Sequence, residues 1–360
     1  MNSVSRRGLI GSAAGAVTLV LTPREASASA WPRRPVTMVI QYAEGGGTDT
    51  IIRALTRPLA RKLGVTIRAV NQPGANGAIA AQSVVARGND GQWLMGGADY
   101  SKTHRLFGHT NNAPWQEWQF FKVGRAVPAW AVAPNSPYRS VADVVKAAID
   151  RPGTVKIANA GIGSIWHEAT LVALERGSGA KFVHVPYDGG APATLAILQG
   201  EADVVASGVH EQVEHLRAGR IRNIGVFRSE PLAVQGLAEP LRPVTESIPN
   251  AAAHGVIEGV YMIAIRRDTS REMLLTLQDA IRDVVSEPEF ADVLRTRVMF
   301  PQFLGGAEVD REAALAEAIT SWLYADYGLP GLKHTPASLG IPRPEDFASY
   351  WPPRGYTPAV

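Results

Sequence analysis

The sequence predicts an α/β fold built from doubly wound sheets. Apolar runs of strand length alternate with stretches of helical spacing over most of the chain, which is typical of βα units. A unit of strand, glycine-rich turn and helix occurs twice, so we expect two such sheets. Roughly 330 residues follow a separate N-terminal segment, and at this length a single core usually gives way to two domains.

The first set of elements has the order β-α-β-α-β, with which a doubly wound sheet begins. The apolar run "VTMVI" reads as a buried strand, and the helix after it should end before Gly64. The expected elements are a strand at 36–40, a helix at 51–63, a strand at 65–70, a helix at 78–86 and a strand at 92–97.

A second set begins where Ser140 can cap a helix. Its expected elements are helices at 141–149, 165–174 and 192–200, and strands at 154–160, 181–187 and 202–207. A strand at 260–265 and helices at 270–285 and 310–324 follow. The element order predicts a first lobe of residues 31–134 and 252–328, a second lobe of residues 135–251, and a Pro-rich C-terminal tail of residues 329–360. The aromatic residues of the tail give it enough apolar surface to dock.

The first thirty residues read as a cleaved export signal. Arg6 and Arg7 form a twin-arginine start, an uncharged apolar run extends from Gly8 to Leu21, and residues 28–30 offer an A-x-A cleavage site. The apolar run is shorter than the roughly 20 residues that a membrane span needs. The pattern therefore indicates export to the periplasm by the twin-arginine route, with no membrane insertion after cleavage.

Charge and cysteine content narrow the function classes. Without residues 1–30 the chain has 33 basic and 32 acidic residues, a net charge of +1 in place of +3. Such a surface offers no strong field for nucleic acid. The sequence contains no cysteine, which excludes disulfides, thiolate metal sites and cysteine catalysis.

Two glycine-rich turns each precede a predicted helix. A helix start has free backbone N–H groups and a positive dipole end, and glycine lets a ligand approach them. Residues 45–49, "GGGTD", form one turn and residues 161–164, "GIGS", form the other. One such turn in each lobe indicates two anion-binding helix ends that face a shared cleft. A bulky replacement at Gly46 or Gly163 should then abolish binding.

The sequence gives weaker support for a nucleotide site, a hydrolase site or a metal site. Neither turn fits a P-loop or a dinucleotide fingerprint. A secreted hydrolase could use Ser164 or Ser207 with a nearby histidine, although no G-x-S-x-G elbow is present. Residues 210–215, "HEQVEH", are not a H-E-x-x-H zinc motif, and we interpret them as a solvated helix face. We expect no metal, no cofactor and no catalytic residue.

Two long segments resemble the solute receptors of tripartite tricarboxylate transporters, also called Bug-type receptors. In the first, "QYAEGGGTDT" and "NQPGANGAIAA" stand where the family has a glycine loop and an N-x-P-G-A-x-G motif. In the second, "GIGSIWH" and "VPYDGG" match a G-x-G-S-x-x-H turn and a V-P-Y-x-G segment. The resemblance covers about residues 32–325. The C-terminal tail has no counterpart in the common pattern.

The resemblance implies a two-lobed periplasmic binding protein of type II fold that closes over a small carboxylate. Gln41, Ala43 and Glu44 depart from the family pattern, and Glu44 could favour a zwitterion or a monoacid. Asp49 either braces its loop or contacts the ligand. The ligand-binding residues that the resemblance implies are Tyr42, Gly45, Gly46, Gly47, Thr48, Asp49, Gly161, Gly163, Ser164, His167, Tyr187 and Gly189.

The expected function is capture of a small organic acid in the periplasm for delivery to a membrane transporter. A di- or tricarboxylate, an amino acid and an aromatic acid all stay open as solutes. A secreted hydrolase and a solute sensor for a signalling partner are the two alternatives. Substrate turnover would distinguish the hydrolase, and capture of a partner through the C-terminal tail would distinguish the sensor.

Overall fold

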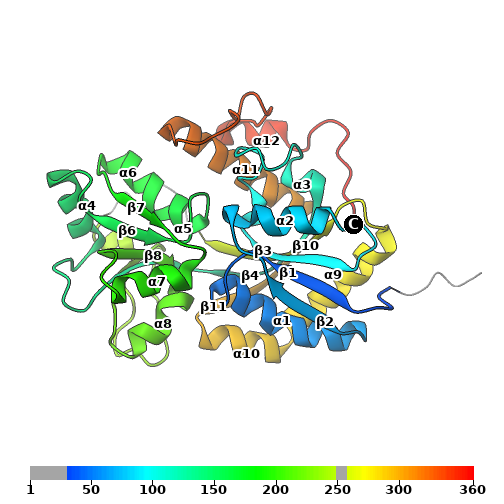
Figure 1. Ribbon diagram of the computed structural model, residues 1–360, viewed down its shortest axis with the longest axis horizontal. Coiled ribbons are helices and arrows are strands. Elements are labelled where there is room, and N and C mark those ends of the chain that lie inside the picture. Colours follow the sequence, from blue (N-terminus) through cyan, green and yellow to red (C-terminus); the bar gives the residue numbers. More distant parts are fainter. Residues whose placement is uncertain (1–30, 249–257) are drawn as a thin grey trace, which may run out of the picture. The chain divides into compact units, whose positions relative to one another are not determined.

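The computed structural model describes residues 31–248 and 258–360, which belong to one compact unit with two mixed sheets (Figure 1). The predicted α/β class is confirmed, because each sheet has a separate apolar core on each of its faces. The expected signal at residues 1–30 and the expected boundary near residue 252 lie outside the described residues. None of the described helices combines the length and apolar character that crossing a membrane requires.

The first sheet has six strands in the order β11-β4-β10-β3-β1-β2. Strands β1 to β3 are parallel, and β4, β10 and β11 extend the sheet in antiparallel fashion. The strands are β1 Val36–Ile40, β2 Ile67–Asn71, β3 Trp93–Ala98, β4 Trp118–Ala126, β10 Gly259–Arg266 and β11 Met299–Leu304. Its main helices are α1 Gly47–Leu63, α2 Ala78–Val85, α9 Arg271–Ser286, α10 Pro288–Thr296 and α11 Gly306–Tyr327.

The second sheet has five strands in the order β7-β6-β8-β5-β9. Strands β6, β7 and β8 are parallel, whereas β5 runs antiparallel to β8 and β9. The strands are β5 Pro128–Val132, β6 Lys156–Asn159, β7 Val183–Pro186, β8 Val204–Gly208 and β9 Arg222–Val226. Its helices are α4 Val141–Asp150, α5 Ile165–His167, the π-helical segment η3 Glu168–Val172, α6 Ala173–Ser178, α7 Gly190–Leu198 and α8 Val209–Arg217.

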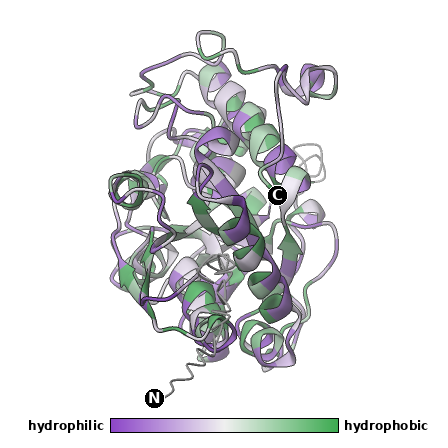
Figure 2. Cartoon of the chain, turned by 90° about the vertical axis from the view of Figure 1, so that its right-hand side faces the viewer, coloured by the Kyte–Doolittle hydropathy of each residue, from purple (hydrophilic) through white to green (hydrophobic). Residues whose placement is uncertain are grey.

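Among the strands and longer helices, five have no counterpart in the sequence-based prediction: β4, β5, β9, α10 and β11. Strands β4 and β5 are buried along nearly their whole length, so they lack the polar alternation that marks a half-exposed strand. The chain passes from the first sheet to the second at Val127, between these two strands. The division of the lobes at residue 134 stays a prediction. Figure 2 shows the strands largely in hydrophobic colours and the helices with both polar and apolar faces.

The C-terminal tail packs on the first sheet's helix α11 and does not extend into solvent. Ile341 and Phe347 are 5% and 2% exposed and contact the alanines of α11 in a small apolar cluster. The Tyr356 hydroxyl donates to the Asp310 carboxylate at 2.8 Å, which fixes the end of the tail to the same helix. The tail is therefore part of the folded unit.

Replacing Phe347 with Ala should destabilise the protein by about 3–5 kcal/mol, the usual cost of removing a buried aromatic ring. Urea unfolding of the variant and of the wild type measures this difference. Tyr350, one helical turn away and 37% exposed, is the matched control, and Tyr350→Ala should cost less than about 1 kcal/mol. Equal and small losses for both variants would mean that the tail does not dock in solution.

Candidate functional site

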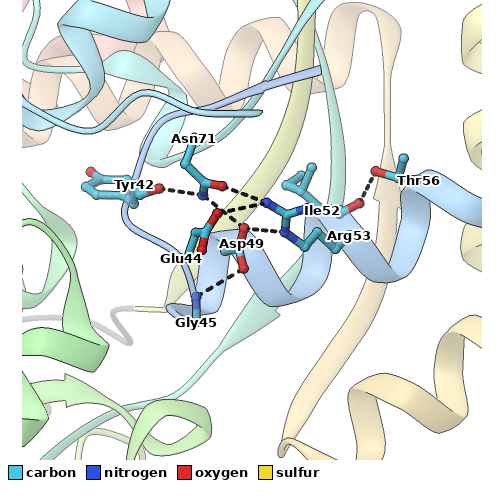
Figure 3. A network of polar contacts seen from close by, with 8 residues as sticks. All are labelled: Tyr42, Glu44, Gly45, Asp49, Ile52, Arg53, Thr56 and Asn71. Atoms are coloured by element: carbon cyan, nitrogen blue, oxygen red, sulfur yellow. Dashed lines mark hydrogen bonds and ion pairs between the residues drawn. The ribbon is translucent and has the colours of Figure 1, made fainter. Parts of the chain in front are cut away.

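The first glycine turn is held by a network centred on Asp49 (Figure 3). Its carboxylate accepts from the Gly45 amide at 3.0 Å, from Arg53 Nε at 2.7 Å and from Asn71 Nδ2 at 2.9 Å. Asn71 Nδ2 also donates to the Tyr42 carbonyl, so β1, β2 and α1 are tied together. All these contacts are made within the turn and its neighbours. These contacts are those of a residue that braces its loop, and a ligand contact by Asp49 stays a prediction.

Helix α1 begins at Gly47, four residues earlier than expected, with Gly46 as its extended N-cap. A side chain at Gly47 would overlap His210 Nε2 and the Tyr261 hydroxyl, whereas a methyl group at Gly46 has room. The close approach that the sequence analysis attached to Gly46 is therefore made at Gly47. The Gly47 amide donates to Glu211 Oε1 at 3.1 Å, so a helix start of the first sheet meets a carboxylate of the second.

At the second glycine turn, too, a helix-start amide bonds a carboxylate from the other sheet's lobe. Ser164 caps helix α5, since its Oγ accepts from the His167 amide at 3.3 Å and donates to the Gly161 carbonyl at 2.8 Å. The Ile165 amide, first in the helix, donates to Asp99 Oδ2 at 3.0 Å. Asp99 follows β3 of the first sheet. Each glycine turn therefore directs a helix-start amide at a carboxylate of the opposite sheet's lobe.

An inner cavity lies between these carboxylates and the glycine turns. Its free volume is about 20 Å³, which holds one or two water molecules because each needs about 10–15 Å³. The predicted ligand residues that line it come from both sheets: Tyr42, Gly46, Gly47, Thr48, Ser164 and Gly189. The structure adds Asp99, Trp166, Gly190, Glu211, Gly259 and Tyr261, with smaller residues between them.

An outer groove of about 890 Å³ lies on the other side of Tyr42. Tyr42, Gly161 and Tyr187 line it, together with Asp188 and with Pro330 of the tail. The remaining predicted ligand residues line neither space: Gly45, Asp49, Gly163 and His167. The structure thus brings eight of the twelve predicted residues to two adjoining spaces.

Gly163 and His167 have structural surroundings of their own. Gly163 has a φ of +96°, and a Cβ there would lie 2.9 Å from Asn76 Nδ2, so this turn presses against the first lobe. The His167 ring is 1% exposed and its Nδ1 lies 3.2 Å from the Tyr324 hydroxyl of α11. Both residues fasten the second glycine turn to the first sheet's lobe and so position the turn beside the cavity.

Glu211 contradicts the interpretation of residues 210–215 as a solvated face. Its side chain is 3% exposed and lies against three backbone amides, of Gly208, Gly47 and Gly190. The Gly208 amide donates to Oε2 at 3.0 Å from the N-cap position of α8. A glutamate three residues after an N-cap is a recognised capping signal, and it was the one local sign of this arrangement.

The two cavity carboxyls have raised pKa values. Burial raises the pKa of Glu211 to about 7, although the three amides oppose the shift. Burial likewise raises the pKa of Asp99 to about 6, while Lys102 and the Ile165 amide lower it. His210, whose Nε2 lies 2.9 Å from the Tyr261 hydroxyl, has a pKa lowered by burial to about 3 and is neutral.

Protein stability should have a maximum at about pH 6. Burial raises the pKa of three carboxyls to about 6 or 7: Asp99, Glu211 and Glu317. Burial lowers the pKa of three histidines to about 3 or 4: His104, His167 and His210. Above about pH 6 the folded state binds more protons through the carboxyls, so stability falls as pH rises. Below about pH 6 the unfolded state binds more protons through its histidines, so stability decreases as the pH is lowered.

Urea unfolding between pH 4.5 and 8.5 tests this pH profile. Glu211→Gln removes one of the raised carboxyls, which binds an extra proton in the folded state between about pH 4.5 and pH 7. The variant should therefore show a steeper rise of stability below about pH 6 and a weaker decline above it. A wild-type stability that keeps rising to pH 8 would contradict the burial of these carboxyls in the folded protein.

The alternative sites are not assembled in the described part of the chain. Ser207 Oγ lies 3.1 Å from Thr194 Oγ1 and accepts from Gln212, and Ser164 Oγ is used by its own turn. Neither hydroxyl has an imidazole ring among its hydrogen-bond partners there, since the His167 group that Ser164 bonds is the backbone amide. Within residues 31–248 and 258–360 no three His, Asp or Glu side chains are grouped as metal ligands.

Comparisons with known proteins agree on one family. Residues 51–310 match the profile of the tripartite tricarboxylate transporter family receptor. A relative from Pseudomonas sp. (strain P51), the UPF0065 protein in the tcbD-tcbE intergenic region, is 26% identical over 81% of this chain and 86% of its own. The UPF0065 protein in the gbd 5' region of Cupriavidus necator is 24% identical over 86% of this chain and 92% of its own length.

Three solved structures share the fold. The periplasmic binding protein BugD has a TM-score of 0.74 at 20% identity, over 83% of this chain and 99% of its own. R. palustris Rpa4515 with adipate has a TM-score of 0.71 at 23% identity, over 83% and 98%. MatC from Rhodopseudomonas palustris, with bound malate, has a TM-score of 0.67 at 21% identity, over 82% and 98%.

Proposed function

Because the chain belongs to the tripartite tricarboxylate transporter receptor family, we propose that it captures a small carboxylate solute in the periplasm and delivers it to membrane transporter subunits. The solute is held between a first lobe of residues 31–134 and 252–328 and a second of residues 135–251. This is a binding-protein family, and the proposed activity is binding without turnover. Export by the twin-arginine route is part of the proposal.

The observation that carries the proposal is the convergence of three helix starts on one cavity. Helices α1, α5 and α7 begin at residues that line it: Gly47, Ile165 and Gly190. A helix start attracts anionic oxygen through its amides and its dipole, and the cavity excludes bulk water, which strengthens both effects. In the structure the anionic oxygens at these three amides belong to Glu211 and Asp99. We propose that the solute's carboxylate binds the amide and hydroxyl of Thr48, in the first turn of α1, and the backbone at Gly189 and Gly190.

The cavity as described is too small for an organic acid. With space for one or two waters, it has to widen before malate or adipate, the ligands of two structural neighbours, could enter. Widening means that contacts across the two lobes open, among them the Gly47 amide to Glu211 and the Ala43 amide to the Asp188 carbonyl. The proposed cycle is therefore a hinge opening, solute entry and closure.

Native mass spectrometry of protein purified from periplasm tests the function, since a retained solute is read directly from its mass. Calorimetry with a panel of carboxylates and amino carboxylates follows, with micromolar affinity expected for at least one solute. An ester and amide substrate screen on the same sample should show no turnover. Absence of any retained or bound solute would contradict the proposal, and turnover would replace it with a hydrolase.

The export route has a separate test. Arg6→Lys together with Arg7→Lys should leave the protein in the cytoplasm, because a twin-arginine signal depends on the arginine pair. Cell fractionation followed by immunoblotting measures the distribution. Normal periplasmic recovery of the double variant would contradict this route and leave solute binding unaffected.

A further inference from the structure

The inner cavity is lined by two buried carboxylates and, among the described residues, by no cationic side chain. Asp99 is 6% exposed and the Glu211 side chain is 3% exposed. Lys102 does not line the cavity: its charge lowers the pKa of Asp99, but its Nζ lies 2.6 Å from Glu168 Oε2. The neutral ring of His210 lies behind Tyr261. No cationic side chain in the described cavity wall therefore pairs with these two carboxylates.

Asp99 has a free acceptor at the cavity. Its Oδ2 takes the Ile165 amide at 3.0 Å. Oδ1 makes no well-formed hydrogen bond within the described part of the chain, although the nearby Val260 amide lowers the pKa of Asp99. Asp99, Tyr100 and Ser101 all have a φ between 54° and 56°, the left-handed region that non-glycine residues rarely adopt. The backbone is thus held in an unfavourable conformation that keeps a buried, incompletely bonded carboxylate at the cavity wall.

Glu211 occupies part of the anion site that the sequence predicts. Its carboxylate takes the amides of Gly47 and Gly190 at the starts of α1 and α7. A solute anion that approached these two amides would meet Glu211 in the same place. An anion without any positive group would also meet Asp99 across the cavity, where screening by water is weak.

Resting on the proposed receptor function, we propose that the solute carries a protonated nitrogen, which binds between Asp99 Oδ1 and Glu211. The substrate class is then an amino carboxylate or a related nitrogen-bearing zwitterion, and plain dicarboxylic acids are selected against. The ammonium group supplies donors for the unbonded oxygen of Asp99, and its charge balances the buried carboxylates. A bound cation would lower the pKa values of both groups, which burial raises.

Matched pairs of solutes test the proposal on the wild-type protein. Adipate is compared with 2-aminoadipate, and malate with aspartate, so that each pair keeps both carboxylates and differs in one ammonium group. Calorimetry at pH 8 keeps both cavity carboxyls largely ionised. The nitrogen-bearing member of at least one pair should bind at least tenfold more tightly than its partner.

Variants locate the effect. Asp99→Asn keeps an acceptor for the Ile165 amide but removes the charge, and it should reduce the preference at least tenfold. Glu211→Gln is a second variant with the same expectation. Asp188→Asn is the control, because this exposed carboxylate lines the outer groove only and its removal should leave the preference unchanged.

The possible results distinguish the preference for a nitrogen-bearing solute from the receptor function on which it rests. Tighter binding of adipate or malate than of the nitrogen-bearing partner would overturn the inference and support the receptor function. A preference that survives both Asp99→Asn and Glu211→Gln would overturn the assignment to these two residues. Failure of every carboxylate and amino carboxylate in the panel to bind would contradict the receptor function and the inference together.

Discussion

Gly47→Ala should weaken solute binding by about a hundredfold, or roughly 2.7 kcal/mol. The added methyl group would overlap His210 Nε2 of the second lobe and the Tyr261 hydroxyl of the first. Overpacking of this kind usually costs about 1–3 kcal/mol. The clash with His210 exists only while the lobes are together, so the substitution penalises the closed form in which solute is held. Calorimetry with the best solute of the panel measures the loss.

Gly46→Ala provides the matched control one residue away. Its backbone already has ordinary angles, and the nearest atoms to an added Cβ are the Ala43 carbonyl oxygen at 3.5 Å and Glu211 Oε1 at 3.7 Å. Affinity should therefore change less than about threefold. The melting temperature of solute-free Gly47→Ala should fall little, because opening relieves much of the clash. Wild-type affinity in Gly47→Ala would show that closure does not bring Gly47 against His210.

The glycine turns could be predicted because their signals are local. A strand, a run of glycines and the first turn of a helix follow one another within about ten residues at Gly45–Gly47 and again at Gly161–Gly163. Five of the twelve predicted residues lie in or beside these two turns and line the inner cavity: Tyr42, Gly46, Gly47, Thr48 and Ser164. Assigning a ligand role to each of them remains a prediction.

The carboxylates of the cavity could not be predicted in the same way. Glu211 bonds the Gly47 amide across 164 positions of sequence, and within "HEQVEHLR" it resembles any charged residue on an exposed helix. Asp99 depends on a left-handed turn of non-glycine residues, a conformation that these residue types rarely adopt and that the local sequence does not indicate. Strands β4 and β5 were missed because burial on both faces removes the alternation that betrays a strand.

Breaking the ion pair between Lys102 and Glu168 should have the largest effect on stability. Lys102 Nζ lies 2.6 Å from Glu168 Oε2, and the two side chains are 5% and 6% exposed. Thr320 of α11 donates to the other Glu168 oxygen at 2.8 Å, so the pair joins the turn after β3, the η3 segment and α11. Lys102→Met would leave Glu168 buried without its cation, at a cost of about 3–5 kcal/mol. Urea unfolding at pH 7 measures the loss.

Restoring neutrality should recover most of that stability. In the double variant Lys102→Met with Glu168→Gln, the amide keeps an acceptor for Thr320 and no uncompensated charge remains. The surface pair of Arg282 and Asp279, 47% and 64% exposed, is the control, and Arg282→Met should cost less than about 1 kcal/mol. Asp99 provides an independent readout: Lys102 lowers its pKa, so Lys102→Met should raise that pKa further and move any Asp99-dependent solute binding to higher pH. Unchanged binding and a loss no greater than in the surface control would mean that the pair is solvated and the lobes are not joined there.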